Sequence, residues 1–356
     1  MRKLIAAACA IREFAVVPRY PTCGAPLVVR ERTRKHSNWL RSRRLIVCAA
    51  VALAGLATTA VPAAAAFPGE NGRISFASNQ SGFSQIYTMN AGGRDLIQLT
   101  FAPGNSVISD WSPDGQRIAF DSDRAGGVEA FTMRSDGSDV RQLTHLSGFT
   151  GDPSWSPDGT QLVFENFPGP GLCCTNLWTI NADGTGVRQL TNFSANTFAG
   201  EPEFSPDGQF IAFQQFPNGI GPGQRSAIFV MRADGSDMRQ VTDIALDAGH
   251  PEWSPDASRI IFNNDLTQAV GDIFTIRPNG TWLTQLTDVT PLGEADFRPD
   301  YSPDGTRIVF NQFIPGQPTK VLVMNADGSG AHVINFNGFA PDWGPQPESE
   351  DTEASR

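Results

Sequence analysis

The sequence predicts an all-β fold, a six-bladed β-propeller of four-stranded antiparallel blades whose ring is closed by the C-terminal strand. Three observations lead to this prediction. The 356 residues include 35 Gly and 26 Pro but only 18% charged residues, a composition that argues against long helices. One turn motif recurs at regular intervals, and short apolar runs of strand type stand at fixed positions between its copies.

The repeated motif is an aromatic residue followed by Ser-Pro-Asp-Gly, with Ala in place of Gly in one copy. Its aromatic positions, including altered copies at the two ends, are Phe67, Trp111, Trp155, Phe204, Trp253, Tyr301 and Trp343. Consecutive copies are 44, 44, 49, 49, 48 and 42 residues apart. Six intervals of this length, each with room for four short strands, are typical of six propeller blades.

Each repeat carries the signals of four strands. After the Pro-Asp-Gly turn comes an apolar run such as 117–120, and a second run such as 129–134 follows a loop of variable length. A turn containing Gly then leads to a short third strand, as at 141–144, and a Pro-aromatic strand such as 153–155 completes the unit. Consecutive apolar positions predict strands buried on both faces, so a blade is unstable alone and the row must close.

The two ends of the repeat array indicate how the ring closes. Residues 67–345 form the predicted propeller, and its first repeat lacks the Pro-aromatic strand, whereas 340–345 supplies an extra copy. We therefore expect the C-terminal strand to complete the first blade. The tail 346–356 is acidic and has no apolar anchor, a composition that predicts disorder.

Residues 1–66 are predicted to be a leader that contains a secretory signal. Arg41, Arg43 and Arg44 precede an apolar region at 45–57, and small residues end at Ala66, after which we expect cleavage. The alternative is an uncleaved anchor, because 45–66 is just long enough to span a bilayer. Either way the sequence predicts that the body is secreted, periplasmic or part of the cell envelope, and cleavage leaves no membrane span in the mature chain.

The mature chain is acidic and poor in cysteine. Residues 67–356 hold 16 basic and 35 acidic side chains, a net charge of −19, which argues against nucleic acid as a partner. Of the five cysteines only Cys173 and Cys174 lie in this part, so no disulfide framework is expected. The adjacent pair is either a strained, redox-sensitive loop disulfide, two loop thiols or an intermolecular link.

The repeated aromatic-Ser-Pro-Asp-Gly turn, with strands such as Arg-Ile-Ala-Phe and Arg-Gln-Leu-Thr, resembles the WD-repeat-like units of the TolB propeller family. The resemblance covers essentially all of residues 67–345 and implies six blades with the Pro-aromatic strand innermost. TolB has an additional α/β domain before its propeller, and related propellers are fused to serine peptidases. This sequence encodes neither, so the resemblance implies a free-standing binding propeller outside the cytoplasm.

No catalytic residue is predicted. The sequence contains no Gly-x-Ser-x-Gly elbow, His-Glu-x-x-His helix or phosphate-binding Gly loop. The repeated Ser and Asp occur once in each blade, whereas a catalytic site needs its members once and together, so we interpret them as turn residues. The repeated aromatic residues are expected to pack between blades and not to form a ligand platform.

One pattern exceeds what the repeat needs. The residues directly before the aromatic positions are acidic in five blades, and those three before it include further charged groups. The candidate ligand-binding residues from these two positions are Asp110, Asp152, Glu201, Glu203, His250, Glu252, Arg298, Asp300 and Asp342. If the family arrangement holds, they line one mouth of the channel and attract cations. The hypothesis is a Ca²⁺ or basic-peptide site with His250 as a ligand; no other cofactor is predicted. The alternative pairs the acids with Arg73, Arg117, Arg259 and Arg307, or with backbone N–H groups.

The loops that emerge on the same side as this mouth vary most in length and composition, for example 168–174, 192–200 and 217–224. Variable loops on a rigid scaffold commonly carry recognition. We therefore expect an exported, non-enzymatic propeller, most simply a monomer, that binds a protein or peptide through its long-loop face and channel mouth. The alternatives are a metal-assisted enzyme of lactonase, phytase or lyase type at the acidic mouth, and an envelope-associated structural protein.

Overall fold

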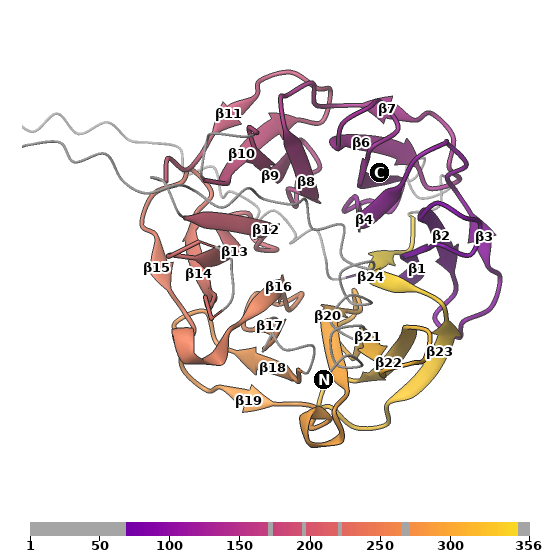
Figure 1. Ribbon diagram of the computed structural model, residues 1–356, viewed down its shortest axis with the longest axis vertical. Helices are drawn as coiled ribbons and strands as arrows, with labels where there is room; N and C mark the ends of the chain where they lie inside the picture. The colour runs from indigo at the N-terminus through magenta and orange to yellow at the C-terminus, as the bar shows by residue number, and fades with distance from the viewer. Residues whose placement is uncertain (1–68, 170–173, 194–196, 220–222, 265–270, 348–356) are drawn as a thin grey trace, which may run out of the picture.

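The computed structural model describes residues 69–169, 174–193, 197–219, 223–264 and 271–347. These form six four-stranded antiparallel sheets arranged as a ring around a central axis (Figure 1), so the predicted fold class is confirmed. The predicted signal at 1–66, Cys173 and most of the acidic tail lie outside the described residues. Within the described ranges, no helix has the length and apolar character needed to cross a bilayer.

Every blade runs from an innermost strand beside the axis to a short strand at the rim. In that order, the strands of blades 1 to 3 are β24 (Phe339–Pro345), β1 (Asn71–Ser78), β2 (Gln85–Met89), β3 (Ile97–Gln98); β4 (Ser106–Trp111), β5 (Arg117–Ser122), β6 (Glu129–Arg134), β7 (Arg141–Gln142); and β8 (Phe149–Trp155), β9 (Gln161–Phe167), β10 (Asn176–Asn181), β11 (Arg188–Gln189).

Blades 4 to 6 repeat the pattern. Their strands are β12 (Phe198–Phe204), β13 (Phe210–Phe216), β14 (Ala227–Arg232), β15 (Arg239–Gln240); β16 (Gly249–Trp253), β17 (Ile260–Asn263), β18 (Ile273–Ile276), β19 (Thr284–Gln285); and β20 (Ala295–Tyr301), β21 (Arg307–Phe313), β22 (Lys320–Asn325), β23 (His332–Phe336). The short 3-10 helices η1 (Ile244–Leu246) and η2 (Thr290–Leu292) lie in loops between blades.

The ring closes as the sequence predicts. Strand β24, the last in the chain, pairs antiparallel with β1, the first, so that Trp343 lies opposite Ile74. Beyond the strand, the Gln346 N–H donates to the Glu70 carbonyl at 2.8 Å. Blade 1 therefore contains both ends of the propeller, and the remaining ring depends on this one pairing for closure.

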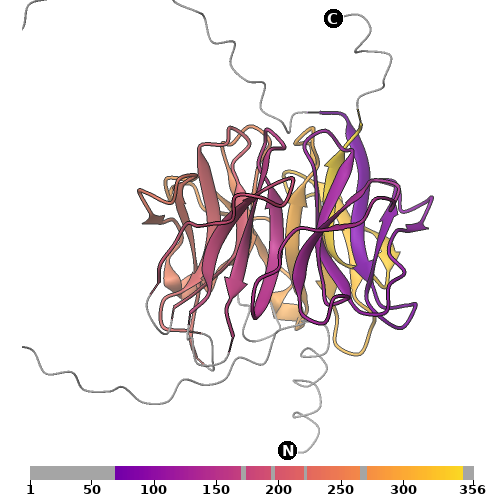
Figure 2. The same cartoon turned by 90° about the horizontal axis from the view of Figure 1, so that it is seen from above.

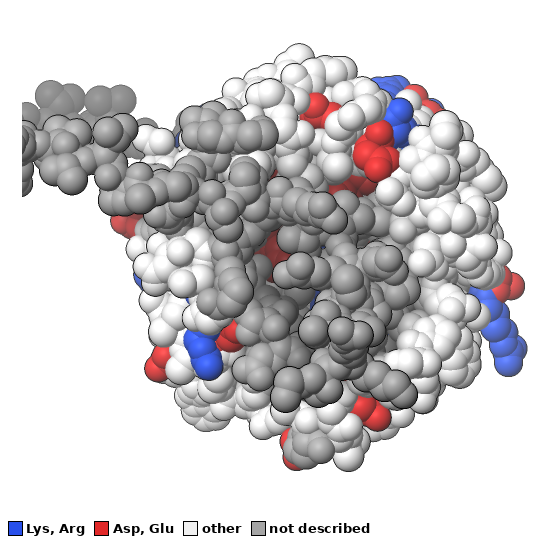
Figure 3. All heavy atoms as spheres, viewed as in Figure 1, with Lys and Arg blue, Asp and Glu red and all other residues white. Residues whose placement is uncertain are grey.

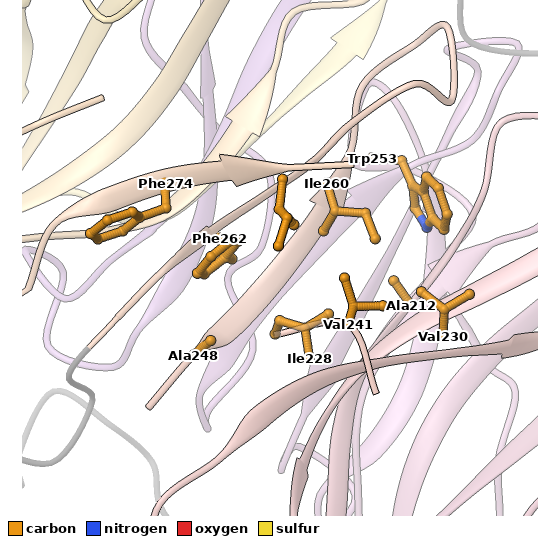
Figure 4. Close-up of a cluster of buried hydrophobic side chains, with 10 residues drawn as sticks. Ala212, Ile228, Val230, Val241, Ala248, Trp253, Ile260, Phe262 and Phe274 are labelled. Carbon is orange, nitrogen blue, oxygen red and sulfur yellow. The ribbon is translucent and has the colours of Figure 1, made fainter. Parts of the chain in front are cut away.

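The hydrophobic core lies between blades and not within them. Six clusters of buried side chains each draw on two neighbouring blades, one cluster at every junction. In the cluster between blades 4 and 5, Trp253 and Phe262 face Ile228 and Val230 (Figure 4). Trp111 likewise packs on blade 1 residues such as Ile86. The prediction that the repeated aromatics pack between blades is confirmed, and this burial explains why no blade is stable by itself.

The Ser-Pro-Asp-Gly segment is a hydrogen-bonded turn. In blade 2 the Ser112 hydroxyl donates to Asp114 at 2.6 Å, and the Gln116 N–H donates to the same carboxylate oxygen at 3.0 Å. Gly115 has φ of 66°, a left-handed conformation that favours Gly. In blade 5 Ala257 takes that position with φ of 56°. The repeated Ser and Asp are thus engaged in their own turns.

Candidate functional site: the central channel

Each innermost strand is interrupted by a β-bulge near the end where the strand begins. The bulged residue has left-handed backbone, with φ from 43° at Ile108 to 53° at Glu201. We call these six residues the mouth ring: Ile108, Asp152, Glu201, His250, Arg298 and Ala340. Left-handed backbone is uncommon for residues other than Gly, and bulges re-aim the side chains that carry them. All six residues line one cavity in the channel.

The residue directly before each aromatic position forms a second ring deeper in the channel. This waist ring consists of Asp110, Ser154, Glu203, Glu252, Asp300 and Asp342. The mouth-side cavity has a volume of about 70 Å³, and a second cavity of about 30 Å³ lies toward the Ser-Pro-Asp-Gly turns. Asp110, Glu203, Glu252 and Asp342 line both cavities, so the waist ring separates them. Acidic atoms are visible in the central recess in Figure 3.

The structure brings the sequence-predicted residues to one channel. All of them line the larger cavity except Asp300, which lines the smaller one. Their arrangement is asymmetric, because the charged members of the mouth ring come from blades 3 to 6, whereas blades 1 and 2 supply Ala340 and Ile108. Ligand binding by these residues remains a prediction.

Four blades, 3 to 6, contribute an ion-pair network to the mouth ring. The His250 Nε2 atom lies 2.9 Å from Glu201 Oε1, and its Nδ1 atom lies 2.9 Å from the Asn263 side-chain oxygen. Both ring nitrogens therefore have a hydrogen-bonding partner, one from the neighbouring blade and one from the same blade. The Arg298 guanidinium lies 3.7 Å from both Asp152 and Glu201. Burial raises the pKa of Glu201, but the charge and hydrogen bonds of His250, with Arg298, lower it to about 2.

Polar residues on the second strands support the mouth ring, and the sequence analysis missed them. The Asn263 side-chain oxygen accepts the Arg298 N–H at 3.1 Å, and that of Asn311 accepts the Ala340 N–H at 2.7 Å. Asp121 and Glu165 hold the equivalent positions, and burial raises the pKa of both well above the usual range. The sequence does carry a signal for these residues. Each repeat has a Phe in its second strand, and the residue after that Phe is polar in five of the six repeats.

In the waist ring, three aspartates hold neighbouring blades together. The carboxylates of Asp110, Asp300 and Asp342 accept the backbone N–H groups of Trp155, Trp343 and Trp111 at 2.6, 2.6 and 2.9 Å. Each bond runs from one blade to the aromatic residue of the next. The alternative that these acids pair with backbone N–H groups is therefore confirmed for the three aspartates.

The other alternative, that these acids pair with the arginines of the second strand, is wrong for the described residues. Arg117 pairs with Asp139 at 2.9 Å, Arg73 donates to Thr88 and Asp95, and Arg259 donates to the Trp282 carbonyl. Arg307 lies over the Trp343 ring. Within the described ranges, no Lys, Arg or His side chain lies within ion-pair distance of a waist-ring carboxyl group.

Without nearby cations, the waist carboxyl groups favour their neutral forms. Burial, followed by repulsion between the acids, raises the pKa of Glu252 well above its usual range. Burial likewise raises the pKa of Glu203 to about 8 and that of Asp342 to about 7. Within the described ranges, no three His, Cys, Asp or Glu side chains are arranged to hold a metal ion.

A family model described as the TolB β-propeller domain matches residues 54–192 and 174–349. The chain belongs to this family. Similar solved structures include TolB from Acinetobacter baumannii (TM-score 0.64, 19% identity, covering 79% of this chain and 67% of that one) and a putative TolB from Agrobacterium tumefaciens (0.58, 21%, 76% and 91%). Hydrazine synthase from Kuenenia stuttgartiensis is also similar (0.64, 18%, 80% and 48%). The comparison with curated proteins gave no significant match.

The similarity to these solved structures supports the propeller fold. The sequence resemblance to the TolB family is confirmed by the family match.

Proposed function

We propose that this TolB-type propeller is exported and binds a protein or peptide partner through its long-loop face and channel mouth, without catalysing a reaction. The observation that carries the proposal is a set of large apolar side chains exposed in loops at the mouth end of the ring. The backbone of the mouth end is at the lower side of Figure 2. Phe101 is 75% exposed, Leu292 70% and Phe83 53%. Aromatic and aliphatic side chains exposed on a rigid scaffold are typical anchors of protein interfaces.

The opposite face also exposes apolar side chains in its outer hairpins, among them Trp282 at 65%, but its turns are repetitive. Its Ser-Pro-Asp-Gly turns repeat the same internal hydrogen bonds from blade to blade, as in Ser156 to Asp158 and Ser302 to Asp304, both at 2.6 Å. The mouth face combines exposed apolar groups with the polar network of His250, Glu201 and Arg298. The TolB family assignment and the signal-like leader support an extracytoplasmic setting for such binding.

The test is site-specific photo-crosslinking in the native cell. A photoreactive amino acid is placed at Phe101 or Leu292 on the mouth face, and at Val187 on the outer edge, which is 42% exposed, as the matched control. A reproducible protein adduct from the mouth-face positions but not from Val187 supports the proposal. Equal labelling from all three positions, or no adduct, contradicts it and favours a structural role in the envelope.

A further inference from the structure

The six residues of the waist ring fall into two sets of three that differ in their hydrogen bonding to the next blade. Its aspartates cap backbone N–H groups at the junctions 6/1, 1/2 and 2/3. The next three blades carry Ser154, Glu203 and Glu252 instead, and within the described ranges none of these side chains accepts a backbone N–H group of the next blade as the three aspartates do. Blades 3 to 5 therefore present a polar wall to the lumen that does not cap the next blade.

The buried hydroxyl of Ser154 points to a ligand independently of the acids. Ser154 is only 3% exposed, it lines the larger cavity, and its Oγ atom has no hydrogen-bond partner. Its one polar neighbour in the described ranges is the Glu203 carboxyl, and the contact between them opposes the burial-driven rise in the pKa of that carboxyl. A buried polar atom left unsatisfied is uncommon in folded proteins, and a water or a bound group in the cavity is one way to satisfy it.

The cavity sets the size of that partner. A volume of about 70 Å³ holds ~5 water molecules, enough for one small organic group and too little for a folded segment. Glu203 and Glu252 border both cavities, so a group bound in either one meets these two carboxyl groups. Trp253 and Tyr301 line the second cavity beside these acids, and aromatic rings with carboxylates are the surroundings that organic cations favour.

We propose that the blade 3–5 wall of the channel binds one organic cation, an alkylammonium or guanidinium group, with Glu203 and Glu252 as counter-charges and Ser154 as a hydrogen-bond acceptor. The group belongs either to a free amine or to a Lys or Arg side chain. A metal ion fits less well, because no three acidic, His or Cys side chains within the described ranges are arranged to coordinate one.

Binding is expected to depend on pH. The charged and titratable groups around Glu203 and Glu252 are Asp110, Asp300 and Asp342 in the waist ring, and Asp152, Glu201, His250 and Arg298 in the mouth ring. Since burial raises the pKa of Glu203 to about 8, this carboxyl must lose its proton to become a full counter-charge. A cation that binds there releases protons, and its affinity rises between pH 6 and pH 8.

The test is calorimetric titration of the full-length protein with n-butylammonium, n-butylguanidinium and uncharged n-butanol at pH 6 and pH 8. A peptide with one central Lys between Gly residues, its Ala counterpart and CaCl₂ are titrated in parallel. The variants are Glu203→Gln, Glu252→Gln and both together. Glu70→Gln removes the same charge from an exposed position outside the channel and is the matched control.

We expect saturable one-to-one binding of a cationic probe that weakens by about tenfold or more in each channel variant and is unchanged in Glu70→Gln. Binding of the free group assigns the site to a small amine, whereas binding of the Lys peptide alone assigns it to a partner side chain. The proposal is overturned if no cationic probe saturates, if n-butanol binds equally, if both Gln variants bind as the parent does, or if only Ca²⁺ binds. Thermal melting of each variant shows that it is folded. The crosslinking test concerns different residues, so the two proposals fail separately.

Discussion

Glu203→Gln removes a buried carboxyl while keeping its shape, and it should change how stability depends on pH. The folded protein raises the pKa of this group from 4.5 to about 8, chiefly through burial. The folded state therefore binds a proton more tightly than the unfolded chain does. Its contribution to stability is fully present below pH 4.5 and is lost as the pH rises toward 8.

The structure sets the size of the effect. One pKa unit corresponds to about 1.4 kcal/mol, so the full shift is worth at most about 5 kcal/mol. Between pH 5 and pH 7 the free energy of unfolding of the parent can fall by at most about 3 kcal/mol through this group. Because Glu203 and Asp342 titrate as interacting sites, the expected fall is about 2 kcal/mol. The Gln variant lacks this loss, so its free energy of unfolding should gain about 2 kcal/mol relative to the parent over the same interval.

The assay is urea unfolding followed by tryptophan fluorescence at pH 5, 6, 7 and 8, with Glu70→Gln as the control. Plotted against pH, the free energies of unfolding of the parent and Glu203→Gln should converge or cross. Those of the parent and the Glu70→Gln control should run parallel. If the parent and Glu203→Gln differ by a constant amount at every pH, the carboxyl is not held neutral by the channel and the reasoning is refuted.

Three other changes test the ring itself. Asp300→Ala removes the acceptor of the Trp343 N–H at the closing junction and should cost about 1–3 kcal/mol of unfolding free energy, whereas Asp300→Asn, which keeps an acceptor, should cost less. Trp253→Ala should cost about 3–5 kcal/mol because the side chain is buried between blades 4 and 5, while Trp282→Ala, 65% exposed, should change stability by less than about 0.5 kcal/mol; equal effects would contradict the interblade core. Deletion of 340–345 removes most of β24 and should abolish cooperative unfolding in urea; retained cooperativity would show that closure is dispensable.

The sequence alone determined the number of blades, the strand order within them and the closure by the last strand. It did so because these features are local or periodic: turn residues at fixed spacing, apolar runs, and one unpaired strand signal at each end. It also indicated which residues lie along the channel, since a position repeated in every blade occupies the same depth in every blade.

Only the tertiary structure decided what those channel residues do. Asp110, Asp300 and Asp342 cap the next blade, whereas Glu203 and Glu252 face the lumen, although all five precede an aromatic residue in the same motif. The bulges of the mouth ring and their support by Asn263 and Asn311 were likewise not evident from the repeat. The reason is physical: whether a carboxylate meets an N–H, a cation or open space depends on the register between strands of different blades, and no local pattern records that register.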